Sequence, residues 1–203
     1  MALVQALPEA DSGYTPVFKK GAKESANVTR TSTRYGREVA ELLRRYADDM
    51  YGYYGRCKRA ALLWDWIAGV AVETLENEYT ATPFQGRVSY GDIRRFADAT
   101  RFHLRAPHQI TNVLFLTGGP SEDAIDELLK RLEVGLPREA LPLLALRAPL
   151  TRGDYLALYR AGRTSPEAVL AMSELHLTPI VGATVARRLA PAQEPLPDAQ
   201  SPA

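Results

Sequence analysis

Helical spacing of the apolar residues is the feature that most restricts the fold of this chain. The apolar residues from Val39 to Met50 recur at i, i+3, i+4 and i+7 intervals, and later segments repeat this spacing. Such intervals place side chains on one face of an α-helix, whereas a half-buried strand alternates apolar and polar residues. No segment shows a sustained alternation. The sequence therefore predicts an all-α protein.

Changes in composition divide the chain into four segments. Residues 1–33 contain prolines, glycines and a polar TRTSTR tract without lasting periodicity, so we expect an extended or disordered arm there. Residues 34–134 are expected to form a helical bundle, and residues 135–190 a smaller domain of short helices. Residues 191–203, PAQEPLPDAQSPA, are rich in Pro and Ala and are expected to be a disordered tail.

One helix of the bundle is expected to lie at its centre. The YGYYG segment at residues 51–55 is expected to interrupt the helical pattern, and a helix over about residues 56–68 follows it. This helix is apolar on nearly all sides, which is typical of a buried helix. Trp64 and Trp66 are therefore expected in the core, and Gly69 is a natural C-terminal stop.

A longer helix is expected to start at Asp92, whose carboxylate can cap the first turn by accepting a backbone N–H. Pro107 is expected to end or kink it, with a continuation to about residue 115. On a helical wheel of about 100° per residue, one side of this helix is suited to face the core. Its members are Ile93, Phe96, Ala97, Thr100 and Leu104.

The remaining sides of this helix carry basic and aromatic residues. A stripe next to the core face consists of Arg94, Asp98, Arg101 and Arg105. Arg95 and Phe102 project nearly opposite the core. This arrangement suits single-stranded nucleic acid, because guanidinium groups neutralise phosphates and a stacked base contributes roughly 1 to 3 kcal/mol. The alternative is that Phe102 packs on another helix and that the arginines pair with Asp98, Glu41 or Glu73.

The overall charge does not decide between these alternatives. With 25 basic and 24 acidic residues the net charge is +1, so a nucleic-acid site has to come from local arrangement. Most basic residues are arginine, which suits planar contacts to phosphates and bases, although a high genomic GC content gives the same bias.

Motifs of common active sites are missing from the sequence. It contains no GxxxxGK[ST], HExxH or CxxC segment. The lone Cys57 excludes an internal disulfide and a cysteine-based zinc site, and it fits a reducing cytoplasm. His103 and His108 stand about 140° apart on a helix and cannot share a metal. We therefore expect no metal, no cofactor and no catalytic residue, in a cytoplasmic protein without a membrane span.

Four segments together resemble a known family. LLWDWIAGVAVETLENEY and the following GDIRRFADATRFHL resemble the ratchet domain of superfamily 2 helicases of the DEAD/DEAH type, in the Ski-like and archaeal repair-helicase group. GLPREALPLLAL and LTRGDYLALYRAGRTSPEAVL are similar to the segments that follow there, which end in a helix-hairpin-helix element. The resemblance covers about residues 34–190. It implies a ratchet-like bundle followed by a small helix-hairpin-helix domain, acting in DNA repair or a related pathway.

The resemblance also implies a path for a single strand of DNA or RNA. In that family the long ratchet helix touches the translocating strand and the helix-hairpin-helix element grips it. Trp64, Trp66, Ile93 and Phe96 would then belong to the core, and Asp92 would be the helix cap. The residues expected to bind nucleic acid are Arg94, Arg95, Arg101, Phe102, Arg105, Arg152, Arg160, Arg187 and Arg188.

Two departures from the family limit what the resemblance implies. The family's glycine-rich hairpin is replaced by Pro149, Leu150 and Thr151, which argues against phosphate binding by backbone amides there; a second turn keeps Gly182. Both ATPase lobes are also missing, so strand movement would need an ATPase partner, in the same chain or in another.

Two other functions are compatible with the sequence. A protein-interaction scaffold could dock on a helicase or another partner through the same surfaces without touching nucleic acid. Base-excision glycosylases and lyases also contain helix-hairpin-helix elements, but they need a catalytic aspartate and often a lysine after the hairpin. Because no lysine follows residue 131, we expect the chain not to be an enzyme.

Overall fold

The computed structural model describes residues 1–7, 10, 15–17, 22–82, 84, 86–114 and 121–190, with the backbone alone at residue 22 and at residues 106–114. These residues form helices and no strand, which confirms the all-α prediction. The helices belong to two compact units, Met1–Arg138 and Glu139–Ala203, and the boundary lies close to the predicted one at 134/135.

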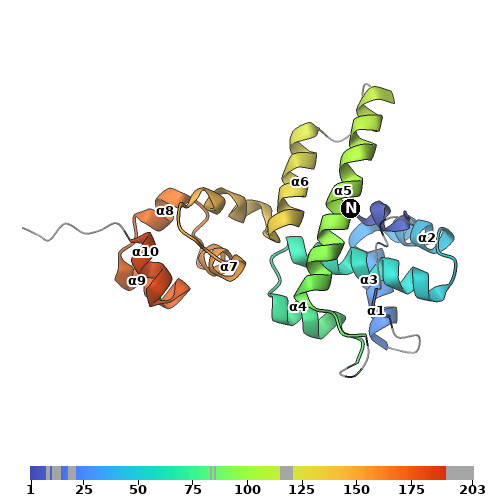
Figure 1. The fold of residues 1–203 in the computed structure, drawn as a ribbon, viewed down its shortest axis with the longest axis horizontal. Coiled ribbons are helices and arrows are strands. Elements are labelled where there is room, and N and C mark those ends of the chain that lie inside the picture. Colours follow the sequence, from blue (N-terminus) through green and yellow to red (C-terminus); the bar gives the residue numbers. More distant parts are fainter. Residues whose placement is uncertain are drawn as a thin grey trace, which may run out of the picture. The chain divides into compact units, whose positions relative to one another are not determined.

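The first unit is built around one central helix. That helix, α3, contacts each of the other elements of the unit, and every residue from Gly55 to Ile67 except Trp64 is buried. Burial on nearly all sides agrees with the prediction from its apolar sequence. In chain order the elements are η1 (Ala2–Ala6), α1 (Ala22–Tyr35), α2 (Arg37–Arg45), α3 (Met50–Ile67), α4 (Val72–Tyr79), α5 (Tyr90–Leu114) and α6 (Glu122–Val134) (Figure 1).

The prediction of an arm over residues 1–33 is wrong in two places. Residues 22–33 belong to α1, and Ala2–Ala6 forms a 3-10 helix that contacts α2, α3 and α5. The side chain of Gln5, which is buried, donates to Thr100 Oγ1 at 2.8 Å and accepts from Arg59 Nε at 2.9 Å. Hydrogen bonds to residues far along the chain hold this segment in place. Such contacts cannot be predicted from the periodicity of the local sequence.

The YGYYG segment begins α3 and does not separate it from another helix. Asp49 caps this helix, because its Oδ1 accepts the N–H of Gly52 at 2.8 Å and so satisfies a donor of the first turn. Trp66 is buried as predicted, and its indole N–H donates to the carbonyl of Leu132 at 2.8 Å. Trp64 is not a core residue: it is 40% exposed and meets the Tyr35 ring edge-on at 5.1 Å.

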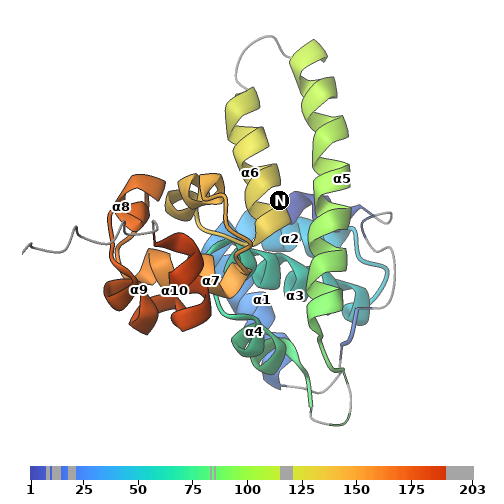
Figure 2. The same cartoon turned by 60° about the vertical axis from the view of Figure 1, so that its left-hand side comes forward.

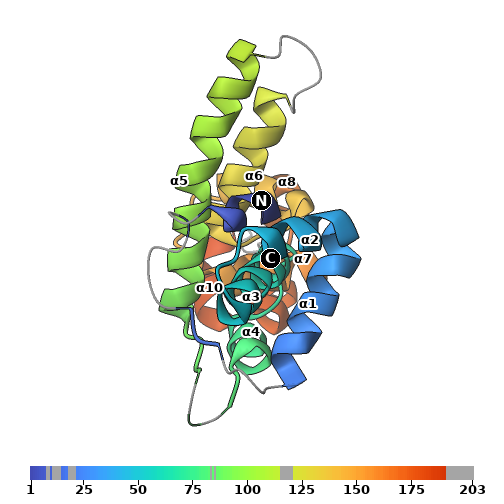
Figure 3. The same cartoon turned by 90° about the vertical axis from the view of Figure 1, so that its right-hand side faces the viewer.

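The long helix α5 differs from its prediction at its start, whereas its end agrees with the predicted continuation to about residue 115. It starts two residues before Asp92, and it continues past Pro107 to Leu114. Figures 2 and 3 show α5 and α6 side by side and antiparallel, projecting beyond the other helices of this unit. The helix that was expected to carry the nucleic-acid site is therefore held along one side by α6.

The second unit consists of short helices separated by defined caps. Thr151 and Ser165 each accept a backbone N–H at a helix start, and Gly162 and Gly182 adopt the positive φ that glycine tolerates. The last two helices of this unit meet at Gly182. The elements are η3 (Arg138–Ala145), α7 (Arg152–Arg160), α8 (Pro166–Leu170), α9 (Glu174–Val181) and α10 (Ala183–Leu189). The predicted tail at 191–203 lies outside the described residues.

Candidate nucleic-acid interface

The start of α5 is fixed by a reciprocal pair of side chains. Ser89 donates its backbone N–H to Asp92 Oδ2 at 3.0 Å, and the N–H of Asp92 points at Ser89 Oγ at 3.4 Å. Asp92 is therefore the third-position partner of a capping box whose cap is Ser89, and not the cap itself. Partial burial would raise the pKa of the Asp92 carboxyl, but hydrogen bonds from Arg95 and Ser89 outweigh burial and lower it.

The predicted core face of α5 is confirmed. Ile93 and Ala97 are fully buried, Phe96 and Thr100 nearly so, and Leu104 packs against the same cluster. The cluster also contains Leu132 of α6 and residues of α3 and α4. Burial of this face fixes the rotation of the helix, so the directions of its other side chains follow.

Two arginines of the predicted stripe connect α5 to α6. Arg94 donates to the backbone carbonyl of Glu133, and Arg101 pairs with the Glu133 carboxylate at 3.1 Å. Arg101 also pairs with Asp98 at 3.2 Å, and the Arg94 and Asp98 side chains approach to 3.9 Å. Arginines beside the last carbonyls of a helix are stabilising, because that end carries partial negative charge. The structure therefore gives Arg94 and Arg101 partners within the protein.

The remaining three predicted residues of α5 are Arg95 and Phe102, on the face opposite the core, and Arg105, the last member of the stripe. Phe102 is 75% exposed, and its ring contacts the edge of His103 with centroids 5.1 Å apart. Arg105, one turn further on, is exposed and forms no ion pair with any residue whose side chain the structure describes. Arg95, two turns before Phe102, pairs with Asp92 at 2.9 Å and lies 4.7 Å over the Phe96 ring. Phe102 and Arg105 are thus the most accessible part of this site.

The other four predicted residues belong to the second unit. Arg152 and Arg160 begin and end α7, and both have interaction partners within the chain. Arg187 pairs with Glu174 at 3.3 Å, whereas its neighbour Arg188 is exposed. Each unit therefore holds one of the two groups of predicted residues.

At the first predicted hairpin, a backbone N–H already donates a hydrogen bond within the protein. The N–H of Thr151 donates to Asp154 Oδ2 at 2.8 Å, as half of a capping box that starts α7. A phosphate would have to displace this carboxylate, which agrees with the expectation that the Pro149–Thr151 turn does not bind through its amides. At the second turn, the N–H of Gly182 donates to Thr178 within the preceding helix at 2.9 Å.

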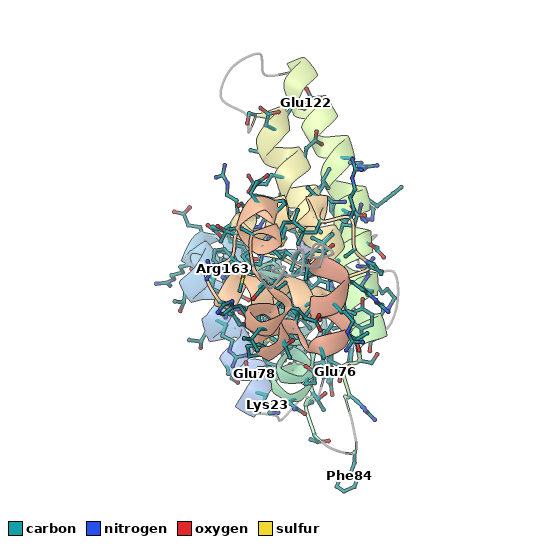
Figure 4. The ribbon with its side chains drawn as sticks, turned by 90° about the vertical axis from the view of Figure 1, so that its left-hand side faces the viewer. Lys23, Glu76, Glu78, Phe84, Glu122 and Arg163 are labelled. Carbon is teal, nitrogen blue, oxygen red and sulfur yellow. The ribbon has the colours of Figure 1, made fainter. Side chains whose placement is uncertain are left out.

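Several exposed groups were not found from the sequence. The Phe84 ring is 95% exposed at the tip of the loop between α4 and α5, where Figure 4 shows it pointing away from the helices of the first unit. Arg147 and Arg163 are exposed in loops of the second unit. A single aromatic or basic residue in a loop has no periodicity, so the sequence offers no pattern by which to select these three.

The described residues offer neither a metal site nor a membrane-spanning helix. They contain no cluster of three His, Cys, Asp or Glu side chains able to hold a metal ion. His176 Nδ1 lies 2.9 Å from Ser173 Oγ, and the side chain of His108 lies outside the described residues. None of the helices in the described ranges is both long and apolar enough to cross a bilayer. Burial raises the pKa of the Cys57 thiol to about 11.

Comparison with known proteins does not assign a family. No protein-family model matches the chain, and no curated protein matches it significantly.

Proposed function

We propose that the chain is a non-catalytic module that binds single-stranded nucleic acid along the exposed face of α5. One observation carries this proposal: Phe102 keeps 75% of its surface exposed on a well-formed helix, with Arg105 one turn away. A ring in this setting can stack on a base while the guanidinium group meets the adjoining phosphate. Movement of the strand would require an ATPase partner, in line with the resemblance to helicases.

The proposed strand path is narrower than the one drawn from the sequence. Arg94 and Arg101 are held by Glu133 and Asp98, so their contribution to phosphate binding is small while these pairs persist. Phe102 and Arg105 supply the main contacts, and Arg95 provides a second cation whose charge is partly offset by Asp92. Contacts of this kind recognise backbone and stacked bases, so we expect little preference for sequence.

The test is a fluorescence-anisotropy titration of the full chain with a labelled oligothymidine and with a duplex of the same length. Phe102→Ala should weaken single-strand binding by about 5- to 150-fold, which corresponds to the loss of roughly 1 to 3 kcal/mol of stacking. Phe84→Ala is the matched control, because it removes an exposed ring from the same unit that lies in the loop before α5 and not on the helix itself. Equal effects of the two substitutions would refute the assigned path.

The salt dependence separates stacking from phosphate contact. Arg105→Gln should make the slope of log affinity against log salt shallower by about 0.7, the value for one phosphate of a single strand. Phe102→Ala should leave that slope unchanged. A slope unchanged by Arg105→Gln would remove Arg105 from the interface.

A second candidate function is a protein-docking scaffold, and the exposed Phe84 favours it. The loop that carries this ring is closed by a 3.1 Å hydrogen bond from Ala81 N–H to Gly86 O and by a 3.0 Å bond from Val88 N–H to Thr80 Oγ1. A braced aromatic ring is a typical interface anchor. Recovery of a stoichiometric partner without nucleic acid, lost in Phe84→Ala and retained in Phe102→Ala, would support this function. For either function we propose a cytoplasmic location, because the single cysteine is buried and free.

A further inference from the structure

A groove on the second unit has apolar walls and a basic edge. Its volume is about 370 Å³, and it is lined by the end of η3, the following loop, α8 and α10. Leu146 and Leu189 are almost fully buried in its lining, whereas Leu170 remains 48% exposed. Pro149 adds a rigid apolar surface. A groove of this kind favours a ligand that offers an apolar side chain.

The two cations of the groove define the charge of that ligand. Arg147 and Arg188 both line the groove, both are exposed, and neither forms an ion pair with a described residue of this unit. By contrast, the neighbouring Arg187 forms an ion pair with Glu174. Opposite charges across an interface favour a specific partner and fix its register. The groove therefore suits an apolar residue flanked by carboxylates.

The chain itself contains such a segment directly beyond the groove. Residues 191–203 read PAQEPLPDAQSPA, in which Leu196 stands midway between Glu194 and Asp198. The described structure ends at Ala190, one residue after Leu189 of the groove lining. Six residues span at most about 20 Å when extended, which is enough to bring Leu196 back to the groove.

The two prolines beside Leu196 lower the cost of ordering this segment. Proline fixes its own φ and biases the residue before it towards extended backbone. We propose that residues 191–203 dock in this groove of their own chain, with Leu196 on its apolar walls and Glu194 and Asp198 beside Arg147 and Arg188.

Docking of this segment would reduce the positive charge that the second unit offers to other anions such as nucleic acid. Arg188, one of the residues expected to bind nucleic acid, would be paired with a carboxylate of the same chain. The proposal does not rest on nucleic-acid binding, because the groove, its charges and the adjoining segment stand on their own. A partner peptide with the same acidic and apolar pattern is the competing occupant.

The test uses methyl NMR of the full chain with a spin label on Ser201→Cys. The native cysteine is buried, so the label attaches at the introduced position. Docking predicts loss of the Leu170 methyl signals by paramagnetic broadening. Leu175 is 79% exposed on α9 and does not line the groove, so its methyl signals should not be broadened.

A charge-reversal variant supplies the control without affecting the fold. Glu194→Arg with Asp198→Arg lies outside the described helices and should restore the Leu170 signals in the labelled chain. Equal broadening of Leu170 and Leu175, or none, would overturn the proposal. Broadening that grows with protein concentration would assign the contact to another copy and would equally overturn docking within one chain.

Discussion

Glu24→Gln should destabilise the first unit strongly, because it leaves a buried ammonium group without its counter-charge. Lys58 Nζ lies 2.7 Å from Glu24 Oε1 and also donates to the carbonyl of Pro16. Both charged side chains are fully buried. Asn27 donates to the second carboxylate oxygen at 3.3 Å, so the carboxylate accepts on both sides.

The expected loss is about 3 to 5 kcal/mol, the usual cost of breaking a buried ion pair from one side. Gln keeps the size of Glu and one acceptor for Lys58, which favours the lower end of that range. Because a domain is stable by only about 5 to 15 kcal/mol, the loss is a large fraction of the total. Glu24→Met combined with Lys58→Met should recover most of the loss, because the double variant buries no charge.

Urea unfolding followed by tryptophan fluorescence is the appropriate assay, because Trp64 and Trp66 both belong to the first unit. The matched control is Glu41→Gln, the same substitution in an exposed pair in which Glu41 lies 2.8 Å from Arg37. An exposed pair contributes roughly 0 to 1 kcal/mol. If Glu24→Gln lowered the free energy of unfolding by no more than Glu41→Gln does, the buried ion pair would be refuted.

The pH dependence of stability gives a second test of the same pair. Burial lowers the pKa of Lys58, only partly compensated by Glu24, so the native state releases this proton at a lower pH than the unfolded chain. Between the lowered pKa and the ordinary 10.5, the unfolded state binds more protons, and this group makes stability rise with pH. The rise should be absent in the double methionine variant. If the stability of the native chain instead fell with pH over this range, relative to the double methionine variant, a buried Lys58 with a lowered pKa would be contradicted.

Three further predictions follow from individual contacts. Arg101→Met should cost about 1 kcal/mol by removing the pair with Glu133, and it should leave the salt slope of nucleic-acid binding unchanged; a shallower slope would place Arg101 on the strand path. Gly86→Ala should cost at least about 1 to 2 kcal/mol, because φ is +69° and a Cβ would lie 2.8 Å from a neighbouring side-chain carbon. Gly36→Ala, with positive φ but open space, should cost less in the same unfolding assay. With its pKa raised to about 11, Cys57 should resist a thiol reagent at pH 8 and react on unfolding; a reactive native thiol would contradict its burial.

Prediction from the sequence succeeded where the signal is local. The core face of α5 and the buried position of most of α3 follow from the spacing of apolar residues over a few helical turns. It failed where a local signal was opposed by distant contacts. Glycine and tyrosine at 51–55 suggested a break, but Asp49 caps a helix there, and packing in the core extends it through Ile67.

The candidate site shows the same division. Wheel geometry correctly placed Phe102 on the side of α5 opposite its buried residues, because a helix has one rotation once its apolar face is buried. It did not reveal that Glu133, 32 residues beyond Arg101, would pair with the arginine stripe. Pairing of this kind depends on α6 packing antiparallel along α5. The residues around Arg101 do not indicate which residue of α6 will lie beside it.

The sequence by itself determined that this protein is helical and which side of α5 is buried, because both follow from the spacing of apolar residues along a few neighbouring turns. Only the tertiary structure decided which charged groups remain available. Arg94 and Arg101 are used within the protein, Trp64 is partly exposed, and Gln5 is buried in the core. The physical reason is that a charge or an aromatic ring is neutralised or covered by whatever the fold brings to it, and those partners lie tens of residues away in the chain.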